Sequence, residues 1–393
     1  MESQYKNLLN LLGACLARET WHPSEDVQWE KLEQLSQIHS VAGFLGYMAM
    51  KASPAPSPEI RARLRGLCMN TIMVFSRRMA MAEDIAAVLA EEKIDHILMK
   101  GFEIRNFYPV PELRTFNDID IVIRPEDRQR SHEKMLELGF QVHADWEPVY
   151  SYVRGEEHYE FHTQIMEIDD LQEDGFQAYF QNMWQYTREI SPHSYRFGPE
   201  YHFLYLLAHI AKHVHHAGAG IRMYLDVAAF LGHYGGTIDW NWIESQLRLM
   251  ELERFAAVVM ASVEKWFGVK CPLELEKISE EIIDEFTEFT MEAGVFGHVN
   301  RDPAMAKLKN ETSRTVGTRM RKALRRTFPD AKSIEKRYVY LQHKPWLLPV
   351  AWVHRVVKNK EKLGQKTREM QNIIGADSAQ VQKLQRLMRN IGL

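Results

Sequence analysis

The sequence has few cysteines, no long hydrophobic run and no repeated or low-complexity segment. Three widely spaced cysteines provide neither a disulfide framework nor a Cys-x-x-Cys metal site. No apolar run reaches the roughly 18 residues of a membrane span, and the first residues lack the basic-then-apolar pattern of a secretion signal. These absences argue against a secreted disulfide-rich or membrane-spanning protein. We expect a cytoplasmic protein whose cysteines, Cys15, Cys68 and Cys271, are core thiols.

Charge is unevenly distributed along the 393 residues, although the net charge is only -4. From Arg301 to the end there are 22 Lys and Arg against 7 Asp and Glu, so the rest of the chain is acidic. A basic region of this kind either meets a polyanion such as RNA or packs against the acidic body of the same protein. Both interpretations remain open at the level of sequence.

Hydrophobic periodicity divides the chain into helical and mixed regions. The length exceeds that of one ordinary domain, and 45% hydrophobic with 26% charged residues is typical of a globular protein. We predict an α+β fold: a small mixed β-sheet core with helical regions on both sides. The predicted regions are an N-terminal helical region (1–92), the α/β core (93–195), a helical domain lining the cleft (196–300) and a basic helical C-terminal region (301–393).

The elements follow from local patterns. A long helix is expected from Ser57-Pro58 to about Glu92, because proline suits the first turn of a helix. Alternating or short apolar runs predict strands at 96–99, 118–123, 140–143, 149–153 and 159–165, with a helix between 124 and 139. After Ser191-Pro192 the chain is expected to return to helix, at 201–216 and 221–231, and later in basic helices at 305–327 and 351–368.

Two carboxylates lie two positions apart in the apolar strand Phe116-Asn117-Asp118-Ile119-Asp120-Ile121-Val122-Ile123. Alternate residues of a strand share a face, so Asp118 and Asp120 would lie side by side. Burying two like charges together is costly, so the pair implies either a bound metal ion or a solvated cleft. Glu160, in Tyr159-Glu160-Phe161-His162, is the candidate for a third ligand, with Glu157 and Asp169 as alternatives. Carboxylates converging from rigid elements are the ligands that Mg²⁺ prefers.

Several motifs together resemble a known family. Met99-Lys100-Gly101, then Tyr108-Pro109, then Leu113-Arg114-Thr115-Phe116-Asn117-Asp118-Ile119-Asp120 and finally Glu160-Phe161-His162 are similar to the uncharacterised bacterial nucleotidyltransferase family of the polymerase-β superfamily. Residues on two later helices, namely His209, Lys212, His213, Arg222 and Asp226, also resemble that family. Many enzymes of the wider superfamily carry a Gly-Ser pair where this chain has Lys100-Gly101.

The resemblance implies a metal-dependent transfer of a nucleoside monophosphate from a nucleoside triphosphate such as ATP to an acceptor hydroxyl or phosphate. Two Mg²⁺ ions, or Mn²⁺, would be held by Asp118, Asp120 and Glu160, with Glu160 also helping to deprotonate the acceptor. Lys100 and Gly101 would cradle the triphosphate. Arg114 would either contact phosphates or pair with the two aspartates. The acceptor class, whether small molecule, RNA or protein, is left open.

The helical residues carry less specific signals. His209 and His213 are spaced as zinc ligands on a helix, but the glutamate of the His-Glu-x-x-His pattern is missing, so packing between helices is the stronger interpretation. Lys212 or Arg222 would then face the nucleotide, and Asp226 would orient Arg222. Two rival functions are a catalytically inactive nucleotide-binding sensor or partner module, and an RNA-binding protein that uses the basic C-terminal region.

Overall fold

The computed structural model describes residues 2–116, 118–146, 148–166, 179–216, 218–294, 345–352 and 378–393. The chain divides into two compact units, residues 1–299 with 391–393 and residues 300–390. The predicted basic helices at 305–327 and 351–368 lie outside the described residues except for positions 351 and 352. The division into four regions therefore stays a prediction. No helix within the described ranges is long and apolar enough to cross a membrane.

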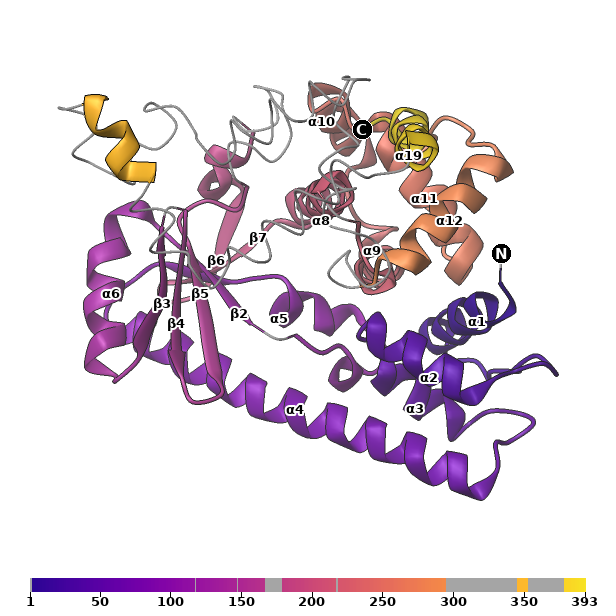
Figure 1. Ribbon diagram of the computed structural model, residues 1–393. Helices are drawn as coiled ribbons and strands as arrows, with labels where there is room; N and C mark the ends of the chain where they lie inside the picture. The colour runs from indigo at the N-terminus through magenta and orange to yellow at the C-terminus, as the bar shows by residue number, and fades with distance from the viewer. Residues whose placement is uncertain are drawn as a thin grey trace. The chain divides into compact units, whose positions relative to one another are not determined.

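The first unit combines helices with one mixed sheet (Figure 1). Its strands are β1 (His96–Leu98), β2 (Ile119–Ile123), β3 (Gln141–Trp146), β4 (Val149–Arg154), β5 (Glu157–His162), β6 (Thr187–Ser191) and β7 (Ser194–Phe197). Its α-helices are α1 (Ser3–Ala17), α2 (Trp29–Ile38), α3 (Ala42–Ala49), α4 (Pro58–Glu91), α5 (Gly101–Ile104), α6 (Arg128–Glu137), α8 (Pro199–His216), α9 (Ile221–Tyr234), α10 (Trp240–Leu249), α11 (Glu253–Phe267) and α12 (Glu280–Ala293). A further helix, α19, spans Ser378–Ile391.

The seven strands lie in the order β3-β4-β5-β2-β1-β7-β6. Strand β2 is central and pairs antiparallel with β1 and parallel with β5. The parallel register places Asp120 opposite Glu160, and Val122 opposite His162. Paired residues of neighbouring strands point to the same face, so the two strands present their polar residues together.

The two faces of the sheet have different chemistry. Ile119, Ile121 and Ile123 pack into a core with Ile85 and Leu89 of α4, whose spacing places them on one face of that helix. Helix α6 adds Met135 to the same core, and Figure 1 shows α4 running beneath the sheet. The opposite face carries the alternate residues of β2 and β5, which include the carboxylates.

The predicted elements are largely present. The long helix starts at Pro58 as expected, where the Ser57 hydroxyl accepts a hydrogen bond from the Ile60 amide. The five predicted strands correspond to β1–β5, and the α+β fold class is confirmed. The helices predicted at 201–216 and 221–231 correspond to α8 and α9. The expected return to helix after Ser191-Pro192 overlooks β7, which forms a hairpin with β6 and adds an edge to the sheet. Strand β6 is almost fully exposed and polar, so it lacks the apolar alternation on which the prediction depended.

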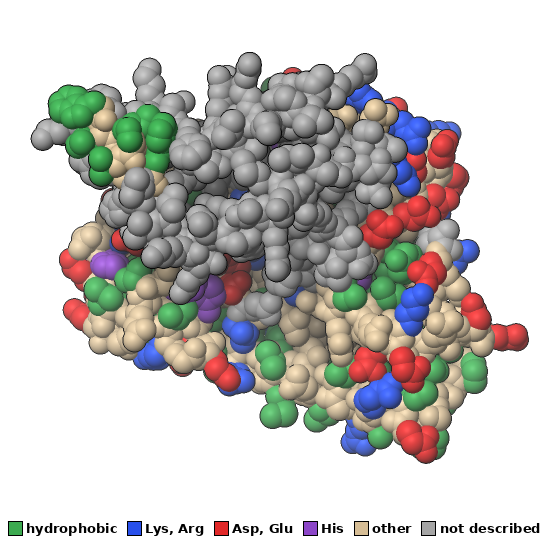
Figure 2. Space-filling model, viewed as in Figure 1, with side chains coloured by type: hydrophobic (Ala, Val, Ile, Leu, Met, Phe, Trp, Pro, Cys, Tyr) green, Lys and Arg blue, Asp and Glu red, His purple; other side chains and the backbone are tan. Residues whose placement is uncertain are grey.

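The described surface carries charges of both signs, and the thiols lie mostly inside the protein. Figure 2 shows acidic and basic side chains interspersed over the described part of the visible face. Cys15 and Cys68 are buried free thiols, as predicted, whereas Cys271 is only partly buried.

Helices α3 and α4 approach each other closely at two glycines. A Cβ placed on Gly46 would lie 2.4 Å from the backbone oxygen of Leu64, and one on Gly43 would lie 2.6 Å from Thr71 Cγ2. We expect Gly46→Ala to lower the free energy of unfolding by about 1–3 kcal/mol, because backbone atoms must move apart. The matched control is Gly66→Ala on α4, where nothing lies within 4 Å of the new Cβ and helix propensity predicts a gain of up to about 1 kcal/mol. Urea unfolding measures both, and equal stability of Gly46→Ala and wild type would contradict the close approach.

Candidate active site

The three predicted carboxylates converge on the open face of the sheet. Asp118 lies just before β2, Asp120 lies within it, and Glu160 is the residue of β5 that pairs with Asp120. Their environments differ: the Asp118 side chain is 43% exposed, whereas that of Asp120 is 10% exposed. The two aspartates therefore have unequal access to solvent although they share a strand.

Two histidines of β5 alternate with Glu160 and contact the aspartates. His158 Nδ1 lies 2.7 Å from Asp118 Oδ1, and His162 Nε2 lies 3.0 Å from Asp120 Oδ1. These side chains form two groups with potential metal ligands within 4.8 Å of one another, one around Asp118 and one around Asp120. Glu160 belongs to both groups, and each aspartate belongs to only one.

Lys100 occupies a strained position next to Asp120. Its backbone has φ 51° and ψ -121°, where residues other than glycine are uncommon, and it turns the chain from β1 into α5. The turn brings Lys100 Nζ to 2.5 Å from Asp120 Oδ1. Strain of this kind costs about 1–3 kcal/mol and persists where the surroundings hold it in place.

The electrostatics of the carboxylates follow from this arrangement. Burial alone would raise the pKa of Asp120, but Lys100 and His162 outweigh it and hold the pKa at about 2. Burial acts in the same direction on Glu160, and the neighbouring charge of Asp120 raises the Glu160 pKa further. Asp120 is therefore held in its ionised form by its neighbours. Ionised Glu160 is not, and an added cation would stabilise its negative charge.

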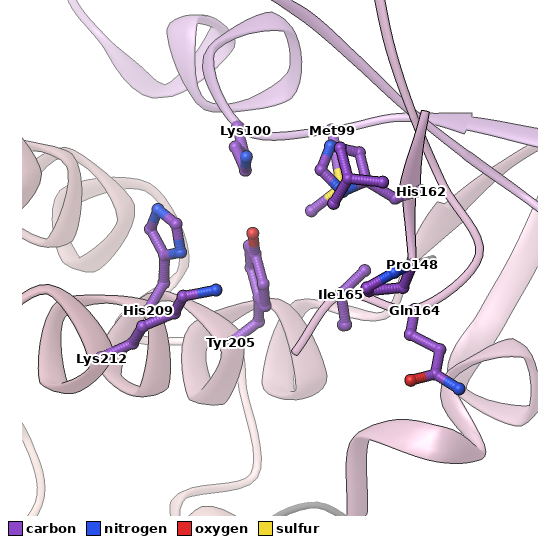
Figure 3. Close-up of a pocket in the computed structure, with 10 residues that line it drawn as sticks. Met99, Lys100, Pro148, His162, Gln164, Ile165, Tyr205, His209 and Lys212 are labelled. Atoms are coloured by element: carbon purple, nitrogen blue, oxygen red, sulfur yellow. The ribbon is translucent and has the colours of Figure 1, made fainter. Parts of the chain in front are cut away.

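A pocket adjoins the carboxylates and separates the sheet from α8 (Figure 3). Lys100 and His162 border it on the sheet side, and both also contact Asp120. Helix α8 contributes Tyr205, His209 and Lys212, whose spacing places them on one face of the helix. The remaining lining residues are Met99, Pro148, Val149, Gln164 and Ile165. The pocket has basic and hydrogen-bonding groups and no acidic lining residue among those described, which suits an anion.

His209 is a neutral member of this pocket. Burial, together with His213 and the nearby lysines, lowers the pKa of His209 well below its usual value. Its Nδ1 is buried and has no hydrogen-bond partner within the described part of the chain. The ring stacks on Tyr205 and meets His213 edge-on, and both neighbours lie one turn away on the same helix, α8. These contacts are within one helix, so packing of His209 and His213 between helices stays a prediction. No third ligand joins the two histidines among the described residues, so no zinc group forms there.

Gly101 was expected to leave room for the triphosphate, but the loop carrying Arg114 and Phe116 packs against it instead. A Cβ at this position would lie 2.5 Å from Phe116 Cβ and 3.1 Å from an Arg114 nitrogen. Phe116 itself belongs to the core beneath β2. A larger residue at position 101 would therefore collide with the loop that leads into Asp118.

Arg114 pairs with a residue that the sequence interpretation did not assign to it. It was expected to contact phosphates or to pair with Asp118 and Asp120. Instead its Nε and Nη2 lie 2.7 Å from Asp226 Oδ1 and Oδ2, in a bidentate ion pair. Tyr108 donates a hydrogen bond of 2.6 Å to the same carboxylate. Burial lets this pair form with little competition from water, and it connects the loop before β2 to α9.

Asp226 was also expected to orient Arg222, and here too the partner differs. Arg222 donates through Nη1 to the backbone oxygen of Thr115, at 3.2 Å. Burial and the nearby Arg114 charge lower the Arg222 pKa to about 10. Of the two basic residues proposed to face the nucleotide, Lys212 is the one that lines the pocket.

Sequence reasoning missed His158 and Tyr205. The signal for His158 was present, because 158, 160 and 162 alternate on one strand exactly as Asp118 and Asp120 do. Tyr205 could have been found from its i, i+4, i+7 spacing with His209 and Lys212. Neither spacing by itself indicates which face of the strand or helix is open.

Comparison with known proteins identifies the family. Residues 25–268, more than half of the chain, match the family described as uncharacterised nucleotidyltransferase. No curated protein and no solved structure matches the chain. The matched range contains the whole sheet, the carboxylates, the pocket and helices α8–α11.

The chain therefore belongs to the uncharacterised nucleotidyltransferase family, as the motifs indicated. By this membership it is a transferase of nucleotidyl groups that uses a nucleoside triphosphate. The carboxylate and histidine groups beside the pocket are able to hold a metal ion.

Proposed function

We propose that the protein transfers a nucleoside monophosphate from a nucleoside triphosphate to an acceptor hydroxyl or phosphate, with divalent ions bound at Asp118, Asp120 and Glu160. One observation carries the proposal: these carboxylates lie beside a basic pocket that shares Lys100 and His162 with their environment. Nucleotidyl transfer requires divalent ions next to a surface that can bind the phosphates of the nucleotide.

The residues fit a divalent ion of the Mg²⁺ or Mn²⁺ type. Each group offers two carboxylates and one imidazole within 4.8 Å, and oxygen-rich sets suit these ions. Glu160 is shared by both groups, so it would help to hold an ion in either of them. When bound, such ions neutralise developing phosphate charge and activate the attacking oxygen.

The chain's own residues would divide the remaining work. Lys100 neutralises Asp120 in the free protein, and it is available to a phosphate oxygen once another cation takes over that carboxylate. Lys212 adds positive charge from the opposite wall of the pocket. Glu160 would help to hold the ions and would help to accept a proton from the acceptor. Arg114 and Gly101 hold the loop that carries Asp118, and Arg222 holds the same loop at Thr115.

Transfer of label from α-³²P nucleotides tests the proposal. The full chain is incubated with each of the four nucleotides, Mg²⁺ or Mn²⁺, and a panel of RNA, protein and small hydroxyl acceptors. We expect labelling that disappears with EDTA and falls to background in Asp118→Asn and Glu160→Gln, because the metal loses a ligand. Glu157→Gln is the matched control, since Glu157 lies on the same strand but pairs with Arg154 at 2.9 Å. Equal labelling by wild type and Asp118→Asn across the panel would refute the catalytic role.

The same assay distinguishes the rival functions. A nucleotide sensor would bind nucleotide by calorimetry and label none of the acceptors. RNA binding is favoured separately by the excess of basic residues after position 301. In that case the full chain would retain RNA with an affinity that falls steeply as salt increases.

A further inference from the structure

Both aspartates of the candidate centre have an imidazole beside them. His158 and His162 lie on the same face of β5, on either side of Glu160. His162 Nε2 is 3.0 Å from Asp120 Oδ1 and 3.7 Å from Glu160 Oε2. His158 Nδ1 is 2.7 Å from Asp118 Oδ1. Each group of potential ligands therefore contains a nitrogen donor as well as oxygen donors.

The separations match those between ligands of a single ion. Divalent first-row ions hold oxygen and nitrogen ligands at about 2.0–2.2 Å, so neighbouring ligand atoms lie about 3 Å apart. The 3.0 Å separation between His162 Nε2 and Asp120 Oδ1 matches this value, whereas the 3.7 Å separation between His162 Nε2 and Glu160 Oε2 is wider. A neutral imidazole can present a lone pair at this distance, with its other nitrogen protonated. Lys100 Nζ lies 2.5 Å from the same oxygen, Asp120 Oδ1, so the lysine would have to move for an ion to bind in that group.

We infer that His158 and His162 are metal ligands, one for each of two ions, and that the mixed donor sets favour Mn²⁺ over Mg²⁺. Mg²⁺ binds almost only oxygen ligands. Mn²⁺ also prefers oxygen, but as a first-row transition ion it accepts an imidazole nitrogen more readily than Mg²⁺ does, although less tightly than the later ions of its row. The inference rests on the proposed function, since it concerns the same centre. It adds a preference for Mn²⁺ over Mg²⁺. It also gives the two histidines the role of metal ligands, beyond hydrogen bonding to the carboxylates.

Mn²⁺ provides a direct readout, because the free ion has a strong EPR signal and ¹⁴N nuclei bound to it modulate the pulsed EPR decay. Mn²⁺ is titrated into the full chain without nucleotide, and Mg²⁺ is then added as a competitor. We expect a ¹⁴N coupling of directly bound imidazole and an affinity for Mn²⁺ at least about tenfold above that for Mg²⁺. His158→Gln and His162→Gln should each weaken Mn²⁺ binding about tenfold or more, and the double variant should lose the coupling.

The matched control is His143→Gln. His143 lies on β3, its ring is 5.6 Å from that of His158, and it is exposed and outside both ligand groups. It should bind Mn²⁺ as wild type does. Mn²⁺ bound without ¹⁴N coupling, or coupling that survives in the double variant, would overturn the role of the histidines and leave the carboxylate centre intact. Absence of Mn²⁺ and Mg²⁺ binding in the wild type would instead count against the proposed function itself. The wild-type spectrum decides between these outcomes even where a variant folds poorly.

Discussion

Replacing Asp226 with asparagine is expected to lower the free energy of unfolding by about 3–5 kcal/mol, because it leaves the guanidinium of Arg114 buried without a counter-charge. Arg114 is 6% exposed and Asp226 is 5% exposed. The carboxylate accepts both Arg114 nitrogens at 2.7 Å and the Tyr108 hydroxyl at 2.6 Å. Asparagine has nearly the same shape but keeps neither the charge nor both acceptor oxygens.

Chemical unfolding of matched variants tests this expectation. Glu244→Gln is the control, because Glu244 pairs with Arg248 at the same 2.7 Å distance but on the surface, where such pairs contribute less than about 1 kcal/mol. The double variant Arg114→Met with Asp226→Leu should be less destabilised than the sum of its single variants, since no unpaired charge remains. If Asp226→Asn lowers the free energy of unfolding as little as Glu244→Gln does, the buried Arg114–Asp226 pair does not contribute the expected stability.

The buried Arg114–Asp226 pair, with Tyr108, connects three motif residues in space. Tyr108, Arg114 and Asp226 each belong to a motif of the sequence, but Asp226 lies more than 100 positions from the other two, and no local pattern predicts their contact. Together they fasten the loop before β2 to α9. Asp118 follows directly from that loop, so the position of a candidate metal ligand depends on a contact between the sheet core and the helical region.

Much of the fold was predictable because the signals are local. The Ser57-Pro58 start of α4 and the apolar run around Asp118 and Asp120 place both elements correctly. The β6–β7 hairpin was missed, because β6 is exposed and its residues carry no alternation. Glu160 was found as a candidate, but its register opposite Asp120 and the approach of Lys100 are tertiary facts. Gly101 illustrates the same limit, since its neighbour Phe116 is brought there by the folded loop.

Acidification from about pH 6.5 to pH 4 is expected to remove about 3 kcal/mol of stability through His39 alone. His39 is fully buried, and its Nδ1 accepts the backbone N–H of Ile221 at 3.3 Å. Its Nε2 must then carry the proton and donate to the Met291 oxygen, at 3.1 Å. Burial is the main cause that lowers the pKa of His39 to about 4, and the hydrogen bond to the Met291 carbonyl acts in the opposite direction. Protonation would place a second hydrogen against the Ile221 N–H.

The direction of the pH effect follows from proton uptake on unfolding. Below pH 6.5 the unfolded chain binds a proton at this imidazole, whereas the folded protein does so only near pH 4. The stabilisation is therefore complete above pH 6.5 and declines as the pH falls toward 4. Urea unfolding of His39→Gln, which can keep one donor and one acceptor, should show a pH dependence about 3 kcal/mol smaller than wild type over this range. The control is His216→Gln, an exposed position, which should keep the wild-type dependence of unfolding free energy on pH. The same dependence in His39→Gln would mean that folded His39 is not held neutral. The hydrogen bonds of His39 to Ile221 of α9 and Met291 of α12 would then tolerate a charged imidazole.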